Sequence, residues 1–456
     1  MCAARCVCGG GDGRGRSTGI RRGDERVSAR SRIRSAVAAA FVSPRRQALA
    51  RDVWALSRRL SGGRARIDYF HQADDPYSHL AVQMLGALGD RYDAEIRVWL
   101  VPPPEPAAAP ESERLGALGL RDAAEVAQAR ALRFPSAARQ PGPDLKALAE
   151  QALAGRLGRS GFSREATEIG EALWSGDAAA LTRLATAVSA DPVAALRTGE
   201  AERRRRGHYL GAMFCFEGEW FWGVDRLGLL EGRLAARGLD REPGAAPLAP
   251  ALEPQLAPRS VGGDGGVIEL WFSFRSPYSW LVFPRIRALA AHYGAELRLR
   301  FILPMVMRGL PVPPPKRNYI TLDCKREADR LGLPFGRIVD PVGAGAERAL
   351  AVLHHAIALG KGEDFAELGL RAAFADGIAL AEDGGLVEVA ARAGLKRDQV
   401  FEALADESWR TVAETNRQAL FEAGLWGAPS FRFNGGPARW GQDRLRALEE
   451  EILRAG

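Results

Sequence analysis

Ser276 and Pro277 come shortly after an apolar run at residues 267–272, which breaks at residues 273–276, and they are the residues whose types and spacing point most clearly to chemistry. Proline suits the first turn of a helix, so Ser276 falls at the N-cap of a helix that the pattern predicts over residues 277–293. Its hydroxyl would then lie beside free backbone N–H groups at the positive end of the helix dipole. Such a hydroxyl serves either as a structural cap or as a place to hold an anion, and the local pattern leaves both interpretations open.

The strands and helices that would position Ser276 can be predicted from the order of apolar patterns along the second half. Residues 267–272 predict a buried strand, the helix over 277–293 comes next, and residues 296–302 alternate like a second strand. After a proline-rich turn at 304–315, residues 316–425 carry helical patterns, and a short strand at 429–433 leads to a last helix at 442–454. A sheet with helices and a helical insertion is an α/β fold.

An internal repeat divides the chain into two halves. Residues 67–78 align without a gap on residues 268–279, and WGVDRL at 222–227 matches WGQDRL at 440–445. Blocks that recur in the same order predict a duplication. We therefore expect two domains, at residues 66–237 and 266–456, joined by a linker at 238–265 that is dense in Pro, Gly and Ala. The length of 456 residues also requires more than one domain.

The first 65 residues are rich in Arg and Gly, and we expect them to be a disordered leader; an organellar transit peptide is the alternative.

The positive charge of the chain is concentrated at its start. Residues 1–66 hold 16 Arg and 4 acidic residues, a net charge of +12. The whole chain has a net charge of +7, so the remainder carries −5. That remainder is mildly acidic and lacks the excess of basic residues that is typical of nucleic-acid-binding proteins. No apolar run reaches the ~18–20 residues of a membrane span. We expect neither nucleic acid nor membrane as a partner.

Cysteine usage predicts a reducing compartment, so the expected location is the cytoplasm. Cys2, Cys6 and Cys8 lie in the leader without further ligands at a suitable spacing, and we expect no metal site.

Three motifs of the second half carry a family resemblance: SPYSWL at 276–281, GAPSF at 427–431 and WGQDR at 440–444. Together they resemble the glutathione-dependent branch of the DsbA superfamily of thioredoxin folds, which contains 2-hydroxychromene-2-carboxylate isomerases and kappa-class glutathione transferases. The resemblance implies two tandem thioredoxin-like domains, each with a helical insertion. It also implies an isomerase that uses glutathione as cofactor and acts on a small aromatic substrate. A kappa-type transferase and a non-catalytic binding protein of the same fold are the alternatives.

The resemblance assigns roles to individual residues. Ser276 would donate a hydrogen bond to the glutathione sulfur, and Pro429 would be a cis-proline that leaves the backbone of Ala428 free for the cysteinyl portion. Gln442 and Asp443 would hold the γ-glutamyl group, for which capping of the last helix is the alternative.

Three further positions, Lys316, Ser279 and Leu310, bear on which chemistry and which substrate the resemblance implies. Lys316 lies where the family has a basic residue near the site, although a solvated helix start is an equal interpretation. Redox members carry Cys-x-x-Cys where this chain has Ser276 and Ser279, so this site cannot form a disulfide. Leu310 stands where the family often has an Asn that contacts cofactor and substrate, and this departure leaves the substrate open.

The first half departs further, because Asp75 replaces the serine and Met213 replaces the proline. We expect a degenerate copy that covers the second domain and takes the place of a homodimer's other subunit, so that the protein is a monomer with paired domains. A second active site with Asp75 as general base is the alternative.

Overall fold

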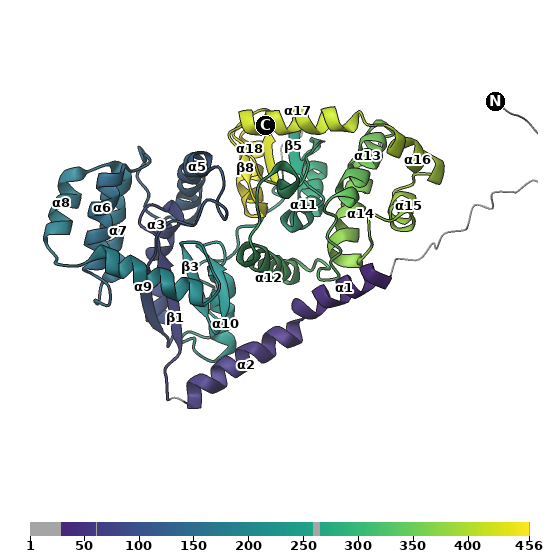
Figure 1. The fold of residues 1–456 in the computed structure, drawn as a ribbon. Coiled ribbons are helices and arrows are strands. Elements are labelled where there is room, and N and C mark those ends of the chain that lie inside the picture. Colours follow the sequence, from purple (N-terminus) through teal and green to yellow (C-terminus); the bar gives the residue numbers. More distant parts are fainter. Residues whose placement is uncertain (1–28, 61, 259–264, 456) are drawn as a thin grey trace, which may run out of the picture.

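The computed structural model describes residues 29–60, 62–258 and 265–455, and it shows two α/β halves side by side (Figure 1). Each half is built on a four-stranded sheet, with the order β2-β1-β3-β4 in the first and β6-β5-β7-β8 in the second. The first pair of strands in each half is parallel and the other pairs are antiparallel. Two thioredoxin-like halves with helical insertions are therefore confirmed, and the shared strand order agrees with the predicted duplication.

The first half inserts five helices between its second and third strands. Its elements are β1 (Arg66–His71), α3 (Pro76–Val82), α4 (Leu85–Arg91), β2 (Glu95–Leu100), α5 (Ser112–Arg130), α6 (Pro143–Ala154), α7 (Phe162–Ser175), α8 (Ala178–Thr186), α9 (Pro192–Arg205), β3 (Met213–Phe216), β4 (Glu219–Trp222) and α10 (Leu227–Ala236).

The second half follows the same plan with a longer insertion. Its elements are β5 (Val267–Phe272), α11 (Pro277–Tyr293), β6 (Glu296–Phe301), the 3-10 turn η1 (Met305–Arg308), α12 (Pro314–Leu331), α13 (Ala344–Ala358), α14 (Gly362–Arg371), the π-helical turn η2 (Ala372–Asp376), α15 (Asp383–Arg392), α16 (Arg397–Ala405), α17 (Trp409–Glu422), β7 (Ser430–Phe433), β8 (Arg439–Trp440), the 3-10 turn η3 (Gln442–Arg444) and α18 (Leu445–Ala455). The last predicted helix thus begins with a separate 3-10 turn.

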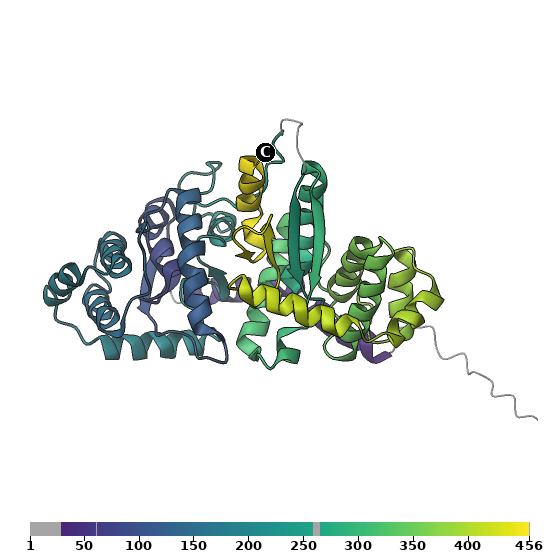
Figure 2. The same ribbon diagram turned by 90° about the horizontal axis from the view of Figure 1, so that it is seen from above.

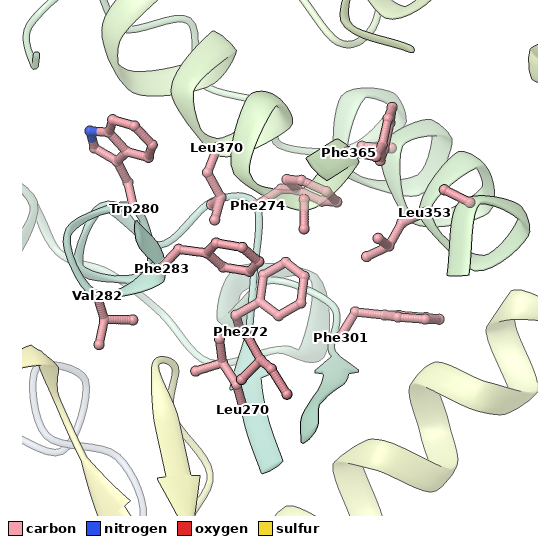
Figure 3. Close-up of a cluster of buried hydrophobic side chains, with 14 of the residues drawn as sticks. Leu270, Phe272, Phe274, Trp280, Val282, Phe283, Phe301, Leu353, Phe365 and Leu370 are labelled. Atoms are coloured by element: carbon pink, nitrogen blue, oxygen red, sulfur yellow. The ribbon is translucent and has the colours of Figure 1, made fainter. Parts of the chain in front are cut away.

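The core of the second half forms around β5, which is buried on both faces. Phe272 packs edge-on against Phe274 and Phe283, and Phe274 in turn meets Phe365 of α14 (Figure 3). Each of these side chains is buried. This cluster joins the strand that precedes Ser276 to the helical insertion, so the backbone at the start of α11 is held from two sides.

Part of the predicted leader is helical, which corrects the expectation of disorder for residues 29–60. α1 (Ala29–Phe41) and α2 (Pro44–Leu60) cross the underside of both halves, and we call this helix pair the strap (Figure 1). Gly218 allows the close approach of α2, since a Cβ there would come within 2.7 Å of the Trp54 indole nitrogen. Arg58 adds an ion pair of 2.8 Å to Glu217. Residues 1–28, including Cys2, Cys6 and Cys8, lie outside the described residues.

Helix α5 of the first half lies against the C-terminal segments of the second (Figures 1 and 2). Leu118 and Leu115 of α5 belong to one apolar cluster with Trp426, Ala428 and Trp440 of the second half. The first half therefore covers the segment around Ala428. Within the described residues, no helix has the length and apolar character required to cross a membrane.

Candidate active site

Ser276 caps helix α11 and also reaches across to a second segment. Its Oγ accepts a hydrogen bond from the N–H of Ser279 at 3.2 Å, which satisfies one of the free donors of the first turn. The same hydroxyl donates to the backbone oxygen of Ala428 at 2.9 Å. The side chain is half-buried. Cap and anion site are thus compatible, since the hydroxyl hydrogen can turn from Ala428 to a ligand.

The Ala428–Pro429 peptide bond is cis, as the resemblance implies. Pro429 accepts a hydrogen bond from the N–H of Gly441 at 3.0 Å, and Ser430 pairs with Trp440 across strands β7 and β8. These contacts bring the start of α11, the cis-proline segment and the start of η3 together. Three of the predicted positions, Ser276, Ala428 and Pro429, are therefore neighbours.

Asp443 lies in η3, and its carboxylate is paired with an arginine of the other half. Arg226 donates to both carboxylate oxygens at 2.8 and 3.1 Å, and to both oxygens of Asp323 at 3.1 and 3.0 Å. The Arg226 side chain is only 4% exposed whereas that of Asp443 is 22% exposed, so Arg226 lies behind a carboxylate that still faces solvent. Burial raises the pKa of Asp443 to about 6, although Arg226 acts to lower it.

Gln442 is buried rather than available to a ligand. It is 1% exposed, its amide N–H donates to Glu327 at 3.0 Å and to Asp443, and its oxygen accepts from Arg285. The structure uses this side chain to orient Asp443, which differs from the predicted direct contact with a cofactor.

Lys316 and Leu310 both lie at the contact between the halves. The Lys316 ammonium donates to the backbone oxygen of Ala108 at 2.9 Å, and burial lowers its pKa. Leu310 is half-buried and packs with Trp426 in the cluster that includes α5. Lys316 therefore binds the first half in this structure. To contact a ligand, its ammonium would first have to leave the Ala108 oxygen.

A reciprocal arrangement surrounds Arg444. This residue donates to Asp122 at 2.7 and 2.8 Å and to Asp225 at 2.9 Å, all in the first half. Asp122 and Asp225 correspond in the repeat to Asp323 and Asp443, which bind Arg226. The two halves are thus joined through equivalent arginines, as two subunits of a symmetric dimer would be.

The second half of the chain is similar in sequence to known proteins. Residues 267–453 match the family described as "DSBA-like thioredoxin domain". The second half is a DSBA-like thioredoxin domain. Two curated relatives are similar to this chain, and both are named 2-hydroxychromene-2-carboxylate isomerase. The protein from Pseudomonas sp. strain C18 is 25% identical over 194 residues, covering 41% of this chain and 90% of the relative. The protein from Pseudomonas putida is 25% identical over 196 residues, covering 41% and 95%.

Solved structures that are similar to this chain include 2-hydroxychromene-2-carboxylate isomerase, at 23% identity and a TM-score of 0.37, covering 41% of this chain and 95% of that one. The cytosolic disulfide reductase DsbM from Pseudomonas aeruginosa, solved with GSH, is 20% identical with a TM-score of 0.32, covering 41% and 99%.

At the position equivalent to Ser276 of the DSBA-like domain, the first half has an aspartate in a purely local role. Asp75 accepts from the N–H groups of Tyr77 and Ser78 at 3.3 and 3.0 Å and from the Ser78 hydroxyl at 2.8 Å. Burial raises its pKa to about 6. Met213, the counterpart of Pro429, is fully buried in β3. Asp75 thus caps helix α3, and the alternative of a second active site with Asp75 as general base stays untested.

No reactive thiol lies in the part of the chain that the structure describes. Cys215 and Cys324 are both free and buried, and burial raises the pKa of Cys215 to about 11 and also raises the pKa of Cys324 well above its usual value. A thiol that stays protonated is a poor nucleophile. Any thiolate chemistry at Ser276 of the DSBA-like domain therefore requires a thiol from outside the described residues.

Sequence reasoning missed Arg226 as a part of this site. The motif repeat did contain the signal, since Asp225-Arg226 and Asp443-Arg444 occupy equivalent positions. The sequence could not predict that Arg226 pairs with Asp443 and Arg444 with Asp225, because each pair joins residues more than 200 positions apart.

Proposed function

We propose that the DSBA-like domain binds glutathione at Ser276 and uses its thiolate to isomerise an aromatic-derived enone or hemiketal. The observation that carries this proposal is the Ser276 hydroxyl at the N-terminus of α11, facing the Ala428–Pro429 segment, at a site without cysteine. The names of the two curated isomerases support the same reaction class.

In the proposed reaction, the glutathione sulfur adds to a conjugated carbon, and the electron pair moves onto the carbonyl oxygen. The former double bond is then single and rotates. Return of the electron pair expels the thiolate, so a carbon–sulfur bond forms and breaks and glutathione is regenerated. Ser276 and the helix dipole stabilise the thiolate without themselves forming a bond to the substrate.

Asp443 is the proposed partner for the γ-glutamyl ammonium, because it is the solvent-facing carboxylate of its cluster. Arg226 holds this carboxylate from behind and Gln442 holds it from the side, so both are positioning residues. Ala428 would offer its backbone to the cysteinyl portion, and Pro429 shapes that segment. Lys316 stays a proposed contact only if a ligand draws its ammonium away from Ala108.

Glutathione affinity should fall as the pH falls through about 6, which is the pKa of Asp443. Above that pH the carboxylate is ionised and attracts the ammonium, and below it the carboxylate is protonated. At pH 5 we expect binding about tenfold weaker than at pH 7, since one unit below a pKa leaves roughly a tenth of the group ionised. Calorimetric titration at several pH values measures this. Asp443→Asn should bind weakly at every pH, and an equally steep pH dependence in that variant would contradict the assignment.

Isomerase activity should require glutathione in catalytic amounts only. Incubating the full chain with cis-enones of aromatic compounds and following products by chromatography tests this, with Asp443→Ala as the inactive control. A product that keeps the glutathione sulfur would indicate the kappa-type transferase instead. Glutathione binding without turnover of any such compound would favour the non-catalytic binding protein, which Leu310 and the paired state of Lys316 both allow.

The first half takes the place of a second subunit in this proposal. Its α5 covers the segment at Ala428, and Arg226 enters the site from it. Light scattering of the full chain should accordingly return the mass of one chain, 49.2 kDa, and a dimer mass would contradict this arrangement.

A further inference from the structure

The strap carries an apolar stripe on the side that faces away from the two halves. Leu49, Val53, Leu56 and Leu60 recur at the spacing of one helix face on α2, and their exposed fractions range from 57% to 80%. On α1, Ile33 and Val37 are each 65% exposed. Of the thirteen large apolar side chains that are exposed among the described residues, seven belong to the strap. Isolated exposed apolar residues are ordinary, but a helical row of them marks an interaction surface.

Arginines flank this stripe. The exposed members are Arg32, Arg34, Arg45, Arg46 and Arg59. Within residues 29–60, 62–258 and 265–455, no carboxylate lies within ion-pair distance of these five. Arg51 and Arg58, which face the body of the protein, pair instead with Glu219 at 3.3 Å and Glu217 at 2.8 Å. The strap thus pairs its inward arginines, while among the described residues its five exposed arginines have no carboxylate partner.

The apolar row and the exposed arginines together restrict the kind of partner that can bind the outer face of the strap. Residues 29–60 contain eight Arg and one acidic residue, Asp52. A symmetric contact with a second copy would bring the same arginines against each other, which is unfavourable. An anionic lipid surface accepts both features, since its headgroups attract arginine and its acyl boundary takes up the apolar row.

We propose that the strap docks the protein onto a membrane surface that contains anionic lipids, with the stripe inserted at the headgroup boundary. α1 and α2 follow one another along one side of both halves, so both helices can lie along a single surface (Figure 1). The expectation of no membrane partner rested on the lack of a spanning run, and a helix that lies on the surface requires no such run.

Co-sedimentation of the full chain with lipid vesicles tests this proposal. The protein should bind vesicles of phosphatidylcholine mixed with phosphatidylglycerol, should bind phosphatidylcholine alone much more weakly, and should be released by salt. The triple variant Leu49→Gln, Val53→Gln, Leu56→Gln should lose affinity by about tenfold or more, because it removes three inserted apolar side chains. Arg45→Gln with Arg46→Gln should weaken binding and reduce its salt dependence.

A matched control removes exposed apolar side chains elsewhere. Val193 and Leu359 are 71% and 42% exposed and lie outside the strap, so Val193→Gln with Leu359→Gln should bind vesicles like the wild type. Circular dichroism and denaturant midpoints of each variant report folding independently of any ligand. Absence of binding to anionic vesicles, or wild-type binding by the triple variant, would overturn the proposal. A wild-type dimer in light scattering that the triple variant abolishes would assign the stripe to a second copy and overturn it as well.

Discussion

Arg226→Met should destabilise the paired halves by about 3–5 kcal/mol, because it leaves one carboxylate without its counter-charge and a second with Arg326 alone. The first of these is Asp443, and the second is Asp323, which is 1% exposed. Denaturant unfolding of the full chain measures the loss. Glutathione binding should change in a characteristic way at the same time. Since Arg226 lowers the pKa of Asp443, its removal should move the pH midpoint of glutathione affinity from about 6 to a higher value.

Arg444→Met is the matched control for this prediction. It breaks the equivalent contacts with Asp122 and Asp225, so it should destabilise the chain by a similar amount. It does not remove the partner of Asp443, and the pH midpoint of glutathione affinity should stay near its wild-type value. Equal shifts of the midpoint in both variants would mean that Arg226 supports only the interface between the halves.

Ser276→Ala should bind glutathione but should fail to lower its thiol pKa, and turnover should fall by roughly 10- to 100-fold. A hydrogen bond to a charged group contributes about 1.5–3 kcal/mol, which corresponds to that range of rates. The ultraviolet absorbance of the thiolate against pH, with glutathione held in the site, measures the pKa directly. In the wild type the thiol should titrate below its value in free glutathione.

Ser279→Ala is the control for the loss of a hydroxyl in the same turn. Ser279 is fully buried, and its Oγ accepts from the N–H of Ser273 at 3.4 Å. Its removal should leave the thiol pKa of bound glutathione unchanged. If Ser276→Ala also left that pKa unchanged, the hydroxyl would be a structural cap and nothing more.

Much of the second half was readable from local patterns. The strand at 267–272 and the helix at 277–293 were predicted to the residue, because apolar periodicity and the Ser276–Pro277 start signal act within a few positions. The neighbourhood of Ser276, Ala428 and Pro429 was reached only through the resemblance, since no local rule joins residues 152 positions apart.

The strap shows why composition can mislead. Sixteen Arg in residues 1–66 indicated disorder, yet the row from Leu49 to Leu60 has the spacing of a helix face and was available as a signal. Gln442 shows the opposite limit. It lies at the start of the last helical segment, as predicted from the motif. Its burial could not be predicted, because its partners Glu327 and Arg285 come from two other helices, α12 and α11, whose packing brings them to Gln442.

Calorimetric titration of glutathione into the full chain, beside Asp443→Ala, tests the central claim most directly. We predict saturable binding to the wild type and binding that is lost or much weaker in the variant, with both proteins equally folded. Absence of binding at millimolar glutathione, or equal binding by the two proteins, would contradict the proposed cofactor site and leave a DSBA-like domain without the chemistry of its named relatives.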